Sequence, residues 1–314
     1  MSNRGSQLWY NGKILSEDKA RISLFTHALH YGTGAFEGIR AYKQKKGGGG
    51  VFRLKEHMER LVESFHIMGF ELPYTAEKLV EAAVDVCKAN NYEECYLRPL
   101  AFIGDGPLGV FPGDKPPIDI AVMAWEWGKY LGAKGENEGT RLVTSSWMRP
   151  QVNTSLAGGK MTGQYLMGVV AKREAVRMGF DEALMLDTEG FFAEGTGENL
   201  FIIKNNIVKT TPLTSILSGI TRSTVMEYFK HQGKTIVEQR FTRDELFTAD
   251  EVFLTGTAAE ITPVKELDNR LIGKGDKKGK PGPITTKLKT DYANIVRGEL
   301  PEYGRNWLTT FQCG

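Results

Sequence analysis

The stretch Ala157–Leu166, AGGKMTGQYL, places a lysine directly behind two glycines and five residues before a tyrosine. Glycine lets a backbone come close to another group, and a lysine amine held in a constrained site can attack a carbonyl carbon. Lys160 therefore has two interpretations. It is either a solvated surface lysine, the usual case, or an amine that binds a carbonyl cofactor.

A carboxylate that could serve such a cofactor lies in the segment GFFAEGTGENLF. A predicted strand delivers Glu194 to a glycine-rich turn, where it could face a pyridinium nitrogen and keep that nitrogen protonated. The alternative is a strand-end carboxylate in water. The same letters do not form a dinucleotide fingerprint, because Leu200 stands where the third glycine belongs and a strand follows.

Two further segments have the chemistry of anion cradles. LSGITR opens a predicted helix, so the backbone amides of Ile220 and Thr221 point outward at the positive end of the helix dipole. LTGTAAE offers Gly256 and Thr257 in a turn. Each segment alone is more often ordinary capping or turn chemistry, but two in one half of a chain favour a phosphate site. Arg60 lies off the apolar stripe of another predicted helix, as a solvated arginine would.

The strand CYLRPL brings two side chains suited to a carboxylate onto one face. Tyr96 and Arg98 are two residues apart, so both leave the same side of a sheet. A hydroxyl beside a guanidinium can bind a carboxylate, although an exposed, stacked pair fits equally well. Pro99 cannot donate to a strand ladder, which predicts an edge or a bulge here. His27 and His30 lack a third metal ligand at suitable spacing, and we interpret them as structural, with no metal expected.

The elements that must position these residues alternate irregularly between strands and helices. Periodic apolar residues predict helices over residues 53–68, 75–90, 162–178, 218–233 and 284–297, the second capped by Thr75. Lys43–Gly50, with four consecutive glycines, is expected to be a flexible exposed loop. The mixture without strict alternation favours an α+β fold. We expect a smaller domain over residues 1–126, an interdomain loop over 127–139 and a larger domain over 140–314.

Composition excludes several function classes. The chain has 314 residues and a net charge of +2, without a basic block, which argues against nucleic acid as a partner. No apolar run reaches the roughly 18 residues of a membrane span, and the start MSNRGSQLWYNG lacks the apolar core of a signal peptide. Three scattered cysteines are typical of a reducing cytoplasm.

Seven segments in this order resemble one family, the branched-chain amino acid aminotransferases of pyridoxal-phosphate fold type IV. They are HALHYGTGAFEGIRAY, FRLKEHMERL, YLRPL, GGKMTGQYL, EGTGENLF, LSGITR and EVFLTGTAAEITPV, and the resemblance extends over nearly the whole chain. Any one of them would be a weak signal, whereas seven in order are specific. The resemblance implies a two-domain α+β fold with a smaller N-terminal α/β domain and a larger, β-rich pseudo-barrel.

The resemblance also implies a role for each matching residue. Lys160 would be the Schiff-base lysine and proton shuttle, Tyr165 would meet the phenolic oxygen of pyridoxal 5'-phosphate, and Glu194 its ring nitrogen. The phosphate would be held by Arg60, Leu217, Ile220, Thr221 and Thr257. The substrate would be bound by Tyr31, Phe36, Gly38, Tyr96, Arg98, Val110, Trp127, Tyr130, Thr257 and Ala258. Val110 falls where the family places a loop that reaches a neighbouring subunit's site, and the segment from Val110 to Pro117 departs from the family pattern beyond Val110.

The implied reaction is ping-pong transamination between leucine, isoleucine or valine and 2-oxoglutarate, through the aminated cofactor. Partners would be small molecules, namely amino acids, glutamate and 2-oxo acids, and the chain would form a homodimer as its minimal unit, with dimer and hexamer left open. Rivals within the fold type are D-amino acid aminotransferases, aminodeoxychorismate lyases and (R)-amine transaminases. A non-catalytic phosphate or nucleotide binder is the rival of another class, but it would have no use for an amine behind two glycines.

Overall fold

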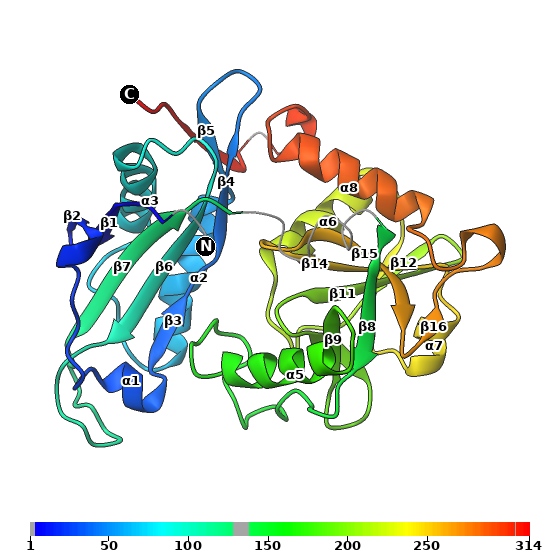
Figure 1. The fold of residues 1–314 in the computed structure, drawn as a ribbon, viewed down its shortest axis with the longest axis horizontal. Helices are drawn as coiled ribbons and strands as arrows, with labels where there is room; N and C mark the ends of the chain where they lie inside the picture. The colour runs from blue at the N-terminus through cyan, green and yellow to red at the C-terminus, as the bar shows by residue number, and fades with distance from the viewer. Residues whose placement is uncertain (1–3, 128–137, 305) are drawn as a thin grey trace. The chain divides into compact units, whose positions relative to one another are not determined.

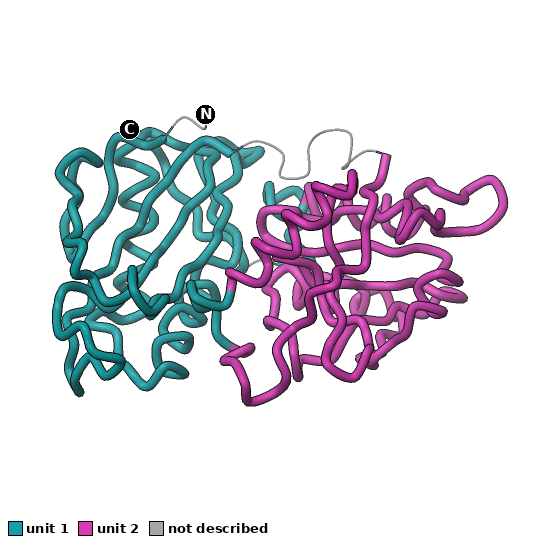
Figure 2. The backbone as a smooth tube through the Cα atoms, turned by 60° about the horizontal axis from the view of Figure 1, so that its bottom comes forward, with its two compact units in different colours: residues 1–128, 159–164, 295–314 teal, residues 129–158, 165–294 magenta. Residues whose placement is uncertain are grey.

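The computed structural model describes residues 4–127, 138–304 and 306–314. The chain divides into two compact units, which are coloured separately in Figure 2. Unit 1 comprises Met1–Gly128, Gly159–Gln164 and Ile295–Gly314, and unit 2 comprises Lys129–Gly158 and Tyr165–Asn294. In the described part of the chain, no helix has the length and apolar character that a membrane crossing requires.

Unit 1 is built on an eight-stranded sheet in the order β17-β5-β4-β6-β7-β1-β2, with β3 paired beside β6. Its strands are β1 (Gln7–Tyr10), β2 (Lys13–Ser16), β3 (Gly34–Phe36), β4 (Ile39–Lys43), β5 (Gly49–Phe52), β6 (Cys95–Ile103), β7 (Ile118–Trp125) and β17 (Leu308–Phe311). Helices α2 (Leu54–Ile67) and α3 (Ala76–Ala89) pack beside this sheet, and the short helix α1 (His27–Tyr31) precedes β3. Figure 1 labels these elements.

The two long helices of unit 1 follow the predicted apolar spacing. Met58, Leu61 and Phe65 on α2 are fully buried in the core of the unit, as their helical spacing predicts. Thr75 caps α3, because its hydroxyl accepts a hydrogen bond of 3.3 Å from the backbone of Lys78. These two predictions are confirmed.

The glycine tract is only partly the loop that we expected. Strand β5 begins at Gly49, and Gly49 and Gly50 are buried within it. A β-carbon at Gly49 would collide with the ring of Phe311 on β17, which pairs with β5. The glycines therefore make room for an aromatic side chain from the far end of the chain, and the expected exposed loop is limited to the turn before Gly49.

Pro99 also lies elsewhere than its chemistry suggested. Strand β6 is in the interior of the sheet, so the prediction of an edge is wrong. Pro99 lies opposite the break between β3 and β4, where Glu37 donates its backbone N–H to the Pro99 carbonyl at 2.8 Å. In an antiparallel strand, the N–H and C=O of one residue point to the same neighbouring strand. The side on which Pro99 lacks an N–H therefore faces the break between β3 and β4, and no hydrogen bond of the sheet is lost.

Unit 2 contains a nine-stranded sheet in the order β10-β9-β8-β15-β14-β11-β12-β13, with β16 paired to β15. Its strands are β8 (Thr140–Thr144), β9 (Glu182–Leu186), β10 (Phe192–Gly195), β11 (Asn199–Lys204), β12 (Ile207–Thr210), β13 (Ile236–Glu238), β14 (Glu251–Gly256), β15 (Glu260–Leu267) and β16 (Arg270–Leu271). An additional pairing of β10 with β11 closes part of the sheet on itself. This closure confirms the predicted β-rich pseudo-barrel, and the two units together confirm the α+β class.

Four helices belong with this second sheet: α5 (Tyr165–Arg177), α6 (Ile220–His231), α7 (Arg243–Phe247) and α8 (Pro283–Ile295). Gly179, with a φ of +81°, follows α5 as a stop signal of the expected kind. The predicted hairpin turn also occurs, because Asn205 and Asn206 both have positive φ between β11 and β12.

The compact units differ from the linear domain boundaries expected from the sequence. The C-terminal segment joins unit 1 because β17 pairs with β5, and Gly159–Gln164 joins it because Met161 forms a β-bridge with Ala35. Most of the expected interdomain loop, residues 127–139, lies outside the described residues, so that boundary stays a prediction.

Candidate active site

The backbone of Lys160 is held on both sides by unit 1. Its N–H donates to the Ser64 hydroxyl on α2 at 3.0 Å, and its carbonyl accepts from the backbone of Phe36 at 3.1 Å. The Lys160 Nζ atom lies 4.8 Å from the centre of the Phe36 ring. The backbone of Lys160 is therefore fixed by hydrogen bonds from two elements, unlike that of a lysine on a free loop.

Glycines allow the close approach that this segment needs. Gly32 has a φ of +66°, and a β-carbon there would lie 2.9 Å from the Cα of Gly163. Thr162 stabilises the same contact, because its hydroxyl donates a hydrogen bond of 2.8 Å to the Gly32 carbonyl. The turn after α1 and the segment after Lys160 thus pack backbone against backbone, as glycine permits.

Arg60 is not the solvated helix arginine that its position suggested. Its side chain is 11% exposed and forms a two-pronged ion pair with the buried Glu37. His57, three residues earlier on α2, also binds Glu37, with 2.7 Å between Nδ1 and Oε2. Sequence reasoning assigned no role to Glu37 or His57, although a single acid between Phe36 and Gly38 was a visible signal.

An aromatic wall surrounds Arg98 on β6. The guanidinium carbon of Arg98 lies 4.8 Å from the ring centre of Phe36 and 5.6 Å from those of Tyr96 and Trp125. The rings of Tyr96 and Trp127 are stacked, with centres 4.5 Å apart. The predicted shared face of Tyr96 and Arg98 is confirmed. The Nε atom of Arg98 is buried without a hydrogen-bond partner among the described residues, so the site retains a donor for an incoming acceptor.

Gly38 makes this arrangement possible. A β-carbon at this position would collide with the hydroxyl of Tyr96. The absence of a side chain at Gly38 therefore sets where the Tyr96 hydroxyl lies, and the predicted place of Gly38 in a substrate pocket stays a prediction.

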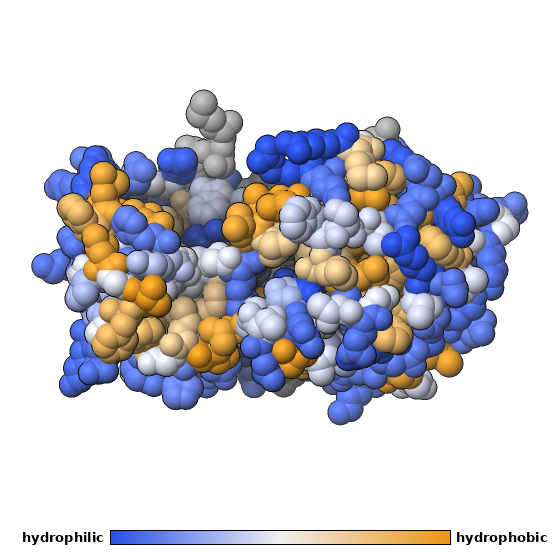
Figure 3. Space-filling model, turned by 90° about the horizontal axis from the view of Figure 1, so that it is seen from below, coloured by the Kyte–Doolittle hydropathy of each residue, from blue (hydrophilic) through white to orange (hydrophobic). Residues whose placement is uncertain are grey.

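Tyr31 and Val110 lie on two segments of unit 1 that are joined by hydrogen bonds. The Tyr31 hydroxyl donates to the Leu108 carbonyl at 2.8 Å, and His27 donates through Nε2 to the Gly109 carbonyl at 2.9 Å. Val110 is 81% exposed. Figure 3 shows apolar patches exposed between hydrophilic surfaces on the face it draws. The predicted reach of Val110 into a neighbouring subunit's site stays a prediction, and Tyr130 lies outside the described residues.

The two histidines of α1 have local partners. His27 accepts the Thr33 hydroxyl at Nδ1, 2.8 Å away, and His30 contacts the Leu24 carbonyl through Nε2 at 3.0 Å. No group of three or more histidine, cysteine or acidic side chains suited to a metal occurs among the residues described here. These contacts agree with the structural interpretation of both histidines.

In unit 2, Glu194 is a buried carboxylate surrounded by donors. Arg149 lies 3.0 Å from its Oε1 atom, and Asn199 donates to its Oε2 atom at 3.1 Å. The backbone N–H of Leu217 points to the same oxygen at 3.4 Å. All three donors suit the acceptor-only, ionised form of the carboxylate. Neither Arg149 nor Asn199 was expected from sequence, because β10 and β11 bring Glu194 and Asn199 together only on folding.

Asn199 connects Glu194 to the first of the two anion cradles. Its side-chain amide donates to the Leu217 carbonyl at 2.9 Å, and a β-carbon at Gly219 would collide with its Oδ1 atom. Helix α6 begins at Ile220, directly after Gly219, so the amides of its first turn have no intrahelical acceptor. Ile220 and Thr221 thus lie in the first turn of a helix, as the sequence pattern predicted, and the phosphate-binding role of these two residues and of Leu217 stays a prediction.

The second cradle is the turn that joins β14 to β15. Gly256 pairs with Glu260 across this turn, and Thr257 and Ala258 form its half-buried tip. Tyr165 is the first residue of α5 in the same unit and is also half-buried. Unit 2 therefore contains the Glu194 carboxylate, both cradles and Tyr165, whereas unit 1 contains Lys160, Arg60 and the aromatic wall.

Comparison with known proteins shows to which family this chain belongs. The family model described as amino-transferase class IV matches residues 34–267. The chain belongs to the class IV aminotransferases. It is 41% identical over 309 residues to a branched-chain-amino-acid aminotransferase of Pseudomonas aeruginosa, covering 98% of both chains. It is 40% identical over 302 residues to the enzyme of that name from Escherichia coli strain K12, covering 96% of both.

Solved structures of class IV aminotransferases have the same fold. The branched-chain amino acid aminotransferase of Escherichia coli superposes with a TM-score of 0.93 at 39% identity, covering 98% of this chain and 99% of that one. The T.th. enzyme of the same name, complexed with N-(5'-phosphopyridoxyl)-L-glutamate, gives a TM-score of 0.91 at 44% identity, with the same coverage.

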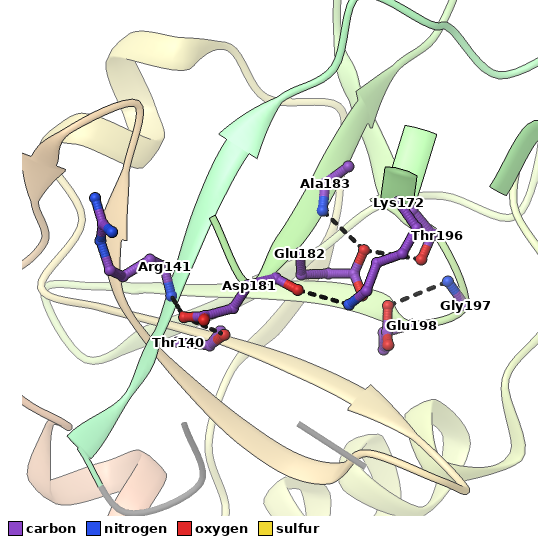
Figure 4. Close-up of polar contacts among 9 residues, drawn as sticks. All are labelled: Thr140, Arg141, Lys172, Asp181, Glu182, Ala183, Thr196, Gly197 and Glu198. Atoms are coloured by element: carbon purple, nitrogen blue, oxygen red, sulfur yellow. Dashed lines mark hydrogen bonds and ion pairs between the residues drawn. The ribbon is translucent and has the colours of Figure 1, made fainter. Parts of the chain in front are cut away.

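This class IV aminotransferase also has a pair of buried acids beside the turn that follows Glu194. Figure 4 shows Lys172, Thr196 and the Ala183 backbone converging on Glu182, with Lys172 at 2.6 Å. Glu198 accepts from the Gly197 backbone at 3.1 Å. Burial, together with the charge of Glu182, raises the pKa of Glu198 to about 8. Glu198 is therefore protonated at neutral pH, beside the contact between Lys172 and Glu182.

This pKa predicts a change in stability with pH. Between the ordinary carboxyl pKa of 4.5 and about 8, the folded chain holds a proton that the unfolded chain releases, so stability falls as pH rises through this window. Glu198→Gln removes the titration and keeps an acceptor for Gly197. We expect it to raise the free energy of unfolding by about 1–3 kcal/mol at pH 8, since one pKa unit is worth about 1.4 kcal/mol.

Thermal unfolding at pH 5 and pH 8 measures this effect, which should nearly vanish at pH 5. Glu189→Gln is the matched control, because Glu189 is 62% exposed and pairs with Arg240 at the surface. We expect that control to change stability by less than about 0.5 kcal/mol at either pH. Destabilisation of Glu198→Gln at pH 8 would show that Glu198 is ionised in the fold.

Proposed function

We propose that this protein is a pyridoxal-phosphate-dependent branched-chain amino acid aminotransferase. It exchanges amino groups between leucine, isoleucine or valine and 2-oxoglutarate. Membership of the class IV family and full-length likeness to enzymes of that name support the reaction. The observation that carries the substrate class is Arg98, whose guanidinium lies inside an aromatic wall and whose buried Nε has no hydrogen-bond partner in the part of the chain that the structure describes. Such a site accepts an alkyl side chain against its rings and a carboxylate on its arginine.

The donor set fits pyridoxal phosphate. An ionised carboxylate such as Glu194 can hold a pyridinium N–H. The first turn of α6 and the β14–β15 turn offer backbone amides for a phosphate. Lys160 offers an amine for an aldehyde. When bound, the cofactor supplies that aldehyde for the substrate amino group and a ring that accepts electron density.

The chain's own residues would perform the remaining steps. Lys160 would remove the proton from the substrate Cα as general base and would return it, as general acid, to the cofactor carbon that carried the aldehyde. Glu194 would keep the proton on the ring nitrogen, and Tyr165 would donate a hydrogen bond to the phenolic oxygen. The phosphate would be held by Arg60, Leu217, Ile220, Thr221 and Thr257.

Substrate recognition divides into a constant and a variable part. The α-carboxylate, which every amino acid has, meets Tyr96 and the amides of Thr257 and Ala258. The side chain meets Phe36, Gly38 and Trp127 when it is apolar. A distal carboxylate meets Arg98, Tyr31 and Tyr130, and Val110 contributes from a neighbouring subunit. Glutamate and leucine thus use one pocket in turn.

The proposal includes a homodimer as the minimal unit and a cytoplasmic location. Exposure of Val110 supports a loop that contacts a second copy of the chain. The free cysteines support a reducing compartment: the sulfur atoms of Cys87 and Cys95 lie 3.7 Å apart and are not bonded to each other.

An amino-donor profile tests the proposal. Purified protein is incubated with 2-oxoglutarate and leucine, isoleucine, valine, D-alanine or an (R)-amine, and glutamate formation is followed. We expect the three branched-chain L-amino acids to react fastest. Borohydride should bleach the yellow colour of the protein by fixing the cofactor to lysine. Preference for D-alanine or an (R)-amine would favour the rival members of the fold type.

Arg98→Ala should separate the two half-reactions. Leucine has no group that meets the guanidinium, whereas glutamate has a distal carboxylate. A charge-assisted hydrogen bond is worth about 1.5–3 kcal/mol, so the glutamate half-reaction should slow roughly ten- to a hundredfold more than the leucine half-reaction. Arg98→Lys should restore only part of the difference, because an ammonium lacks the planar fork.

Stopped-flow measurement of each half-reaction separates three outcomes for Arg98. A selective loss with glutamate supports the assigned role. Equal losses would show that Arg98 binds the α-carboxylate shared by both substrates. No loss would leave Arg98 as part of the aromatic wall alone.

A further inference from the structure

Three buried or nearly buried side chains of unit 1 form what we call the Glu37 cluster: Glu37, His57 and Arg60. Their side chains are 0%, 2% and 11% exposed. Glu37 lies in the short link between β3 and β4, and the other two lie on one face of α2. A buried carboxylate is costly unless it is fully paired, so this cluster needs an explanation.

The geometry of the cluster fixes the plane of one guanidinium. Arg60 donates from Nε to Oε1 of Glu37 at 2.7 Å and from Nη2 to Oε2 at 2.9 Å. This two-pronged pairing specifies both the direction and the rotation of the guanidinium. His57 adds a bond of 2.7 Å between Nδ1 and Oε2, so Glu37 is held from both of its neighbours on α2.

The charges of the cluster agree with this geometry. Burial is the largest single effect and opposes ionisation of Glu37, but the charge and hydrogen bonds of Arg60 together with the contact to His57 outweigh it, so the pKa of Glu37 lies well below its usual range. Burial lowers the pKa of His57, an effect that Arg60 and Lys160 support and the Glu37 charge opposes. His57 is therefore neutral at pH 7 and donates its Nδ1–H to an ionised Glu37.

The elements that hold Arg60 also hold Lys160. Phe36, adjacent to Glu37, donates its backbone N–H to the Lys160 carbonyl, and Ser64, one turn beyond Arg60 on α2, accepts the Lys160 N–H. The backbone of Glu37 is itself fixed by its hydrogen bond to Pro99. The same elements thus fix the side chain of Arg60 and the backbone of Lys160.

We propose that Glu37 and His57 are positioning residues that orient Arg60 for the phosphate group of the cofactor. This inference rests on the proposed function, which assigns Arg60 to the phosphate. Arg60 then meets the phosphate without having to be ordered at the moment of binding, because its orientation is already fixed by folding. Loss of Glu37 or of the His57 donor should weaken the hold on phosphate and leave the rest of the cofactor's binding intact.

The test compares pyridoxal phosphate with pyridoxal, which lacks the phosphate. The full-length chain, freed of cofactor, is titrated with each compound, and the absorbance of the lysine-bound form gives both dissociation constants. Their ratio isolates the phosphate contribution. We expect Glu37→Gln and His57→Leu to lower the preference for pyridoxal phosphate roughly tenfold, the scale of one charge-assisted hydrogen bond. Arg60→Ala should lower it at least as much.

Two controls distinguish a positioning role of Glu37 and His57 from a purely structural role. His57→Asn retains an N–H near the place of Nδ1 and should keep most of the preference that His57→Leu loses. Adding Glu37→Gln to Arg60→Ala should not change the ratio further, because Glu37 acts through Arg60. If Glu37→Gln does not fold, the His57→Asn and His57→Leu pair carries the test alone.

Several outcomes would overturn the inference. Equal weakening of pyridoxal and pyridoxal phosphate in the Glu37 and His57 variants would show a structural role only. An unchanged ratio in Arg60→Ala would show that the cluster does not act on the phosphate, although the proposed function could still hold. Failure of the wild-type chain to bind either compound would overturn the proposed function as well.

Discussion

Replacement of Lys160 by alanine is expected to abolish transamination. The variant lacks the amine that would bind the cofactor aldehyde and also the base that would act at the substrate Cα. Loss of a positioned general base alone costs about 10²–10⁴ in rate, so a loss at or beyond the upper end is expected when both functions disappear. Turnover of leucine with 2-oxoglutarate measures the rate, and mass spectrometry after borohydride treatment measures covalent fixation of the cofactor.

Lys55→Ala is the matched control for this experiment. Lys55 lies on α2 like Ser64, which holds the Lys160 backbone, but its side chain is 67% exposed. It should retain wild-type turnover and borohydride fixation. Retention of near wild-type activity by Lys160→Ala would reject the assignment of the nucleophile, and fixation at another lysine would identify its replacement.

Features governed by local physical chemistry could be predicted from the sequence. The apolar spacing of α2 determined its buried face, and the two-residue repeat placed Tyr96 and Arg98 on one side of β6. Asn205 and Asn206 marked a hairpin turn because asparagine tolerates positive φ. In each case the relevant neighbours are close in sequence, so the residues themselves carry the information.

Features that depend on distant partners could not be predicted in this way. The burial of Gly49 in a strand depends on Phe311 at the other end of the chain. The sequence around Arg60 predicts a solvated helix residue, because it does not show that Glu37 pairs with this arginine in the fold. The sequence around Arg149 likewise gives no indication that Arg149 pairs with Glu194. Nothing local distinguishes a glycine that makes room for a ring from one that forms a loop, because the ring is supplied by tertiary pairing.

We expect a second large loss of rate for Glu194→Gln, and the pairing of Arg149 with Glu194 is one of its causes. In the wild-type chain, both carboxylate oxygens face donors, with Arg149 at Oε1 and Asn199 at Oε2. A glutamine brings an NH₂ group into this set, so one donor must face another donor. The neutral amide also lacks the charge that would keep a proton on the ring nitrogen.

Glu194→Gln should therefore bind the cofactor and lose most of its rate. Lys160 and the phosphate-binding groups are unchanged, so the colour of the lysine-bound cofactor should persist. Removal of one preorganised electrostatic group typically costs about 10²–10³ in rate, and we expect a loss of that order in single-turnover reaction with leucine. Glu189→Gln, an exposed carboxylate on the turn before β10, should react like the wild type. If single-turnover rates in Glu194→Gln equal those of this control, the carboxylate serves only to anchor Arg149 and Asn199, and the ring nitrogen must be protonated by another group.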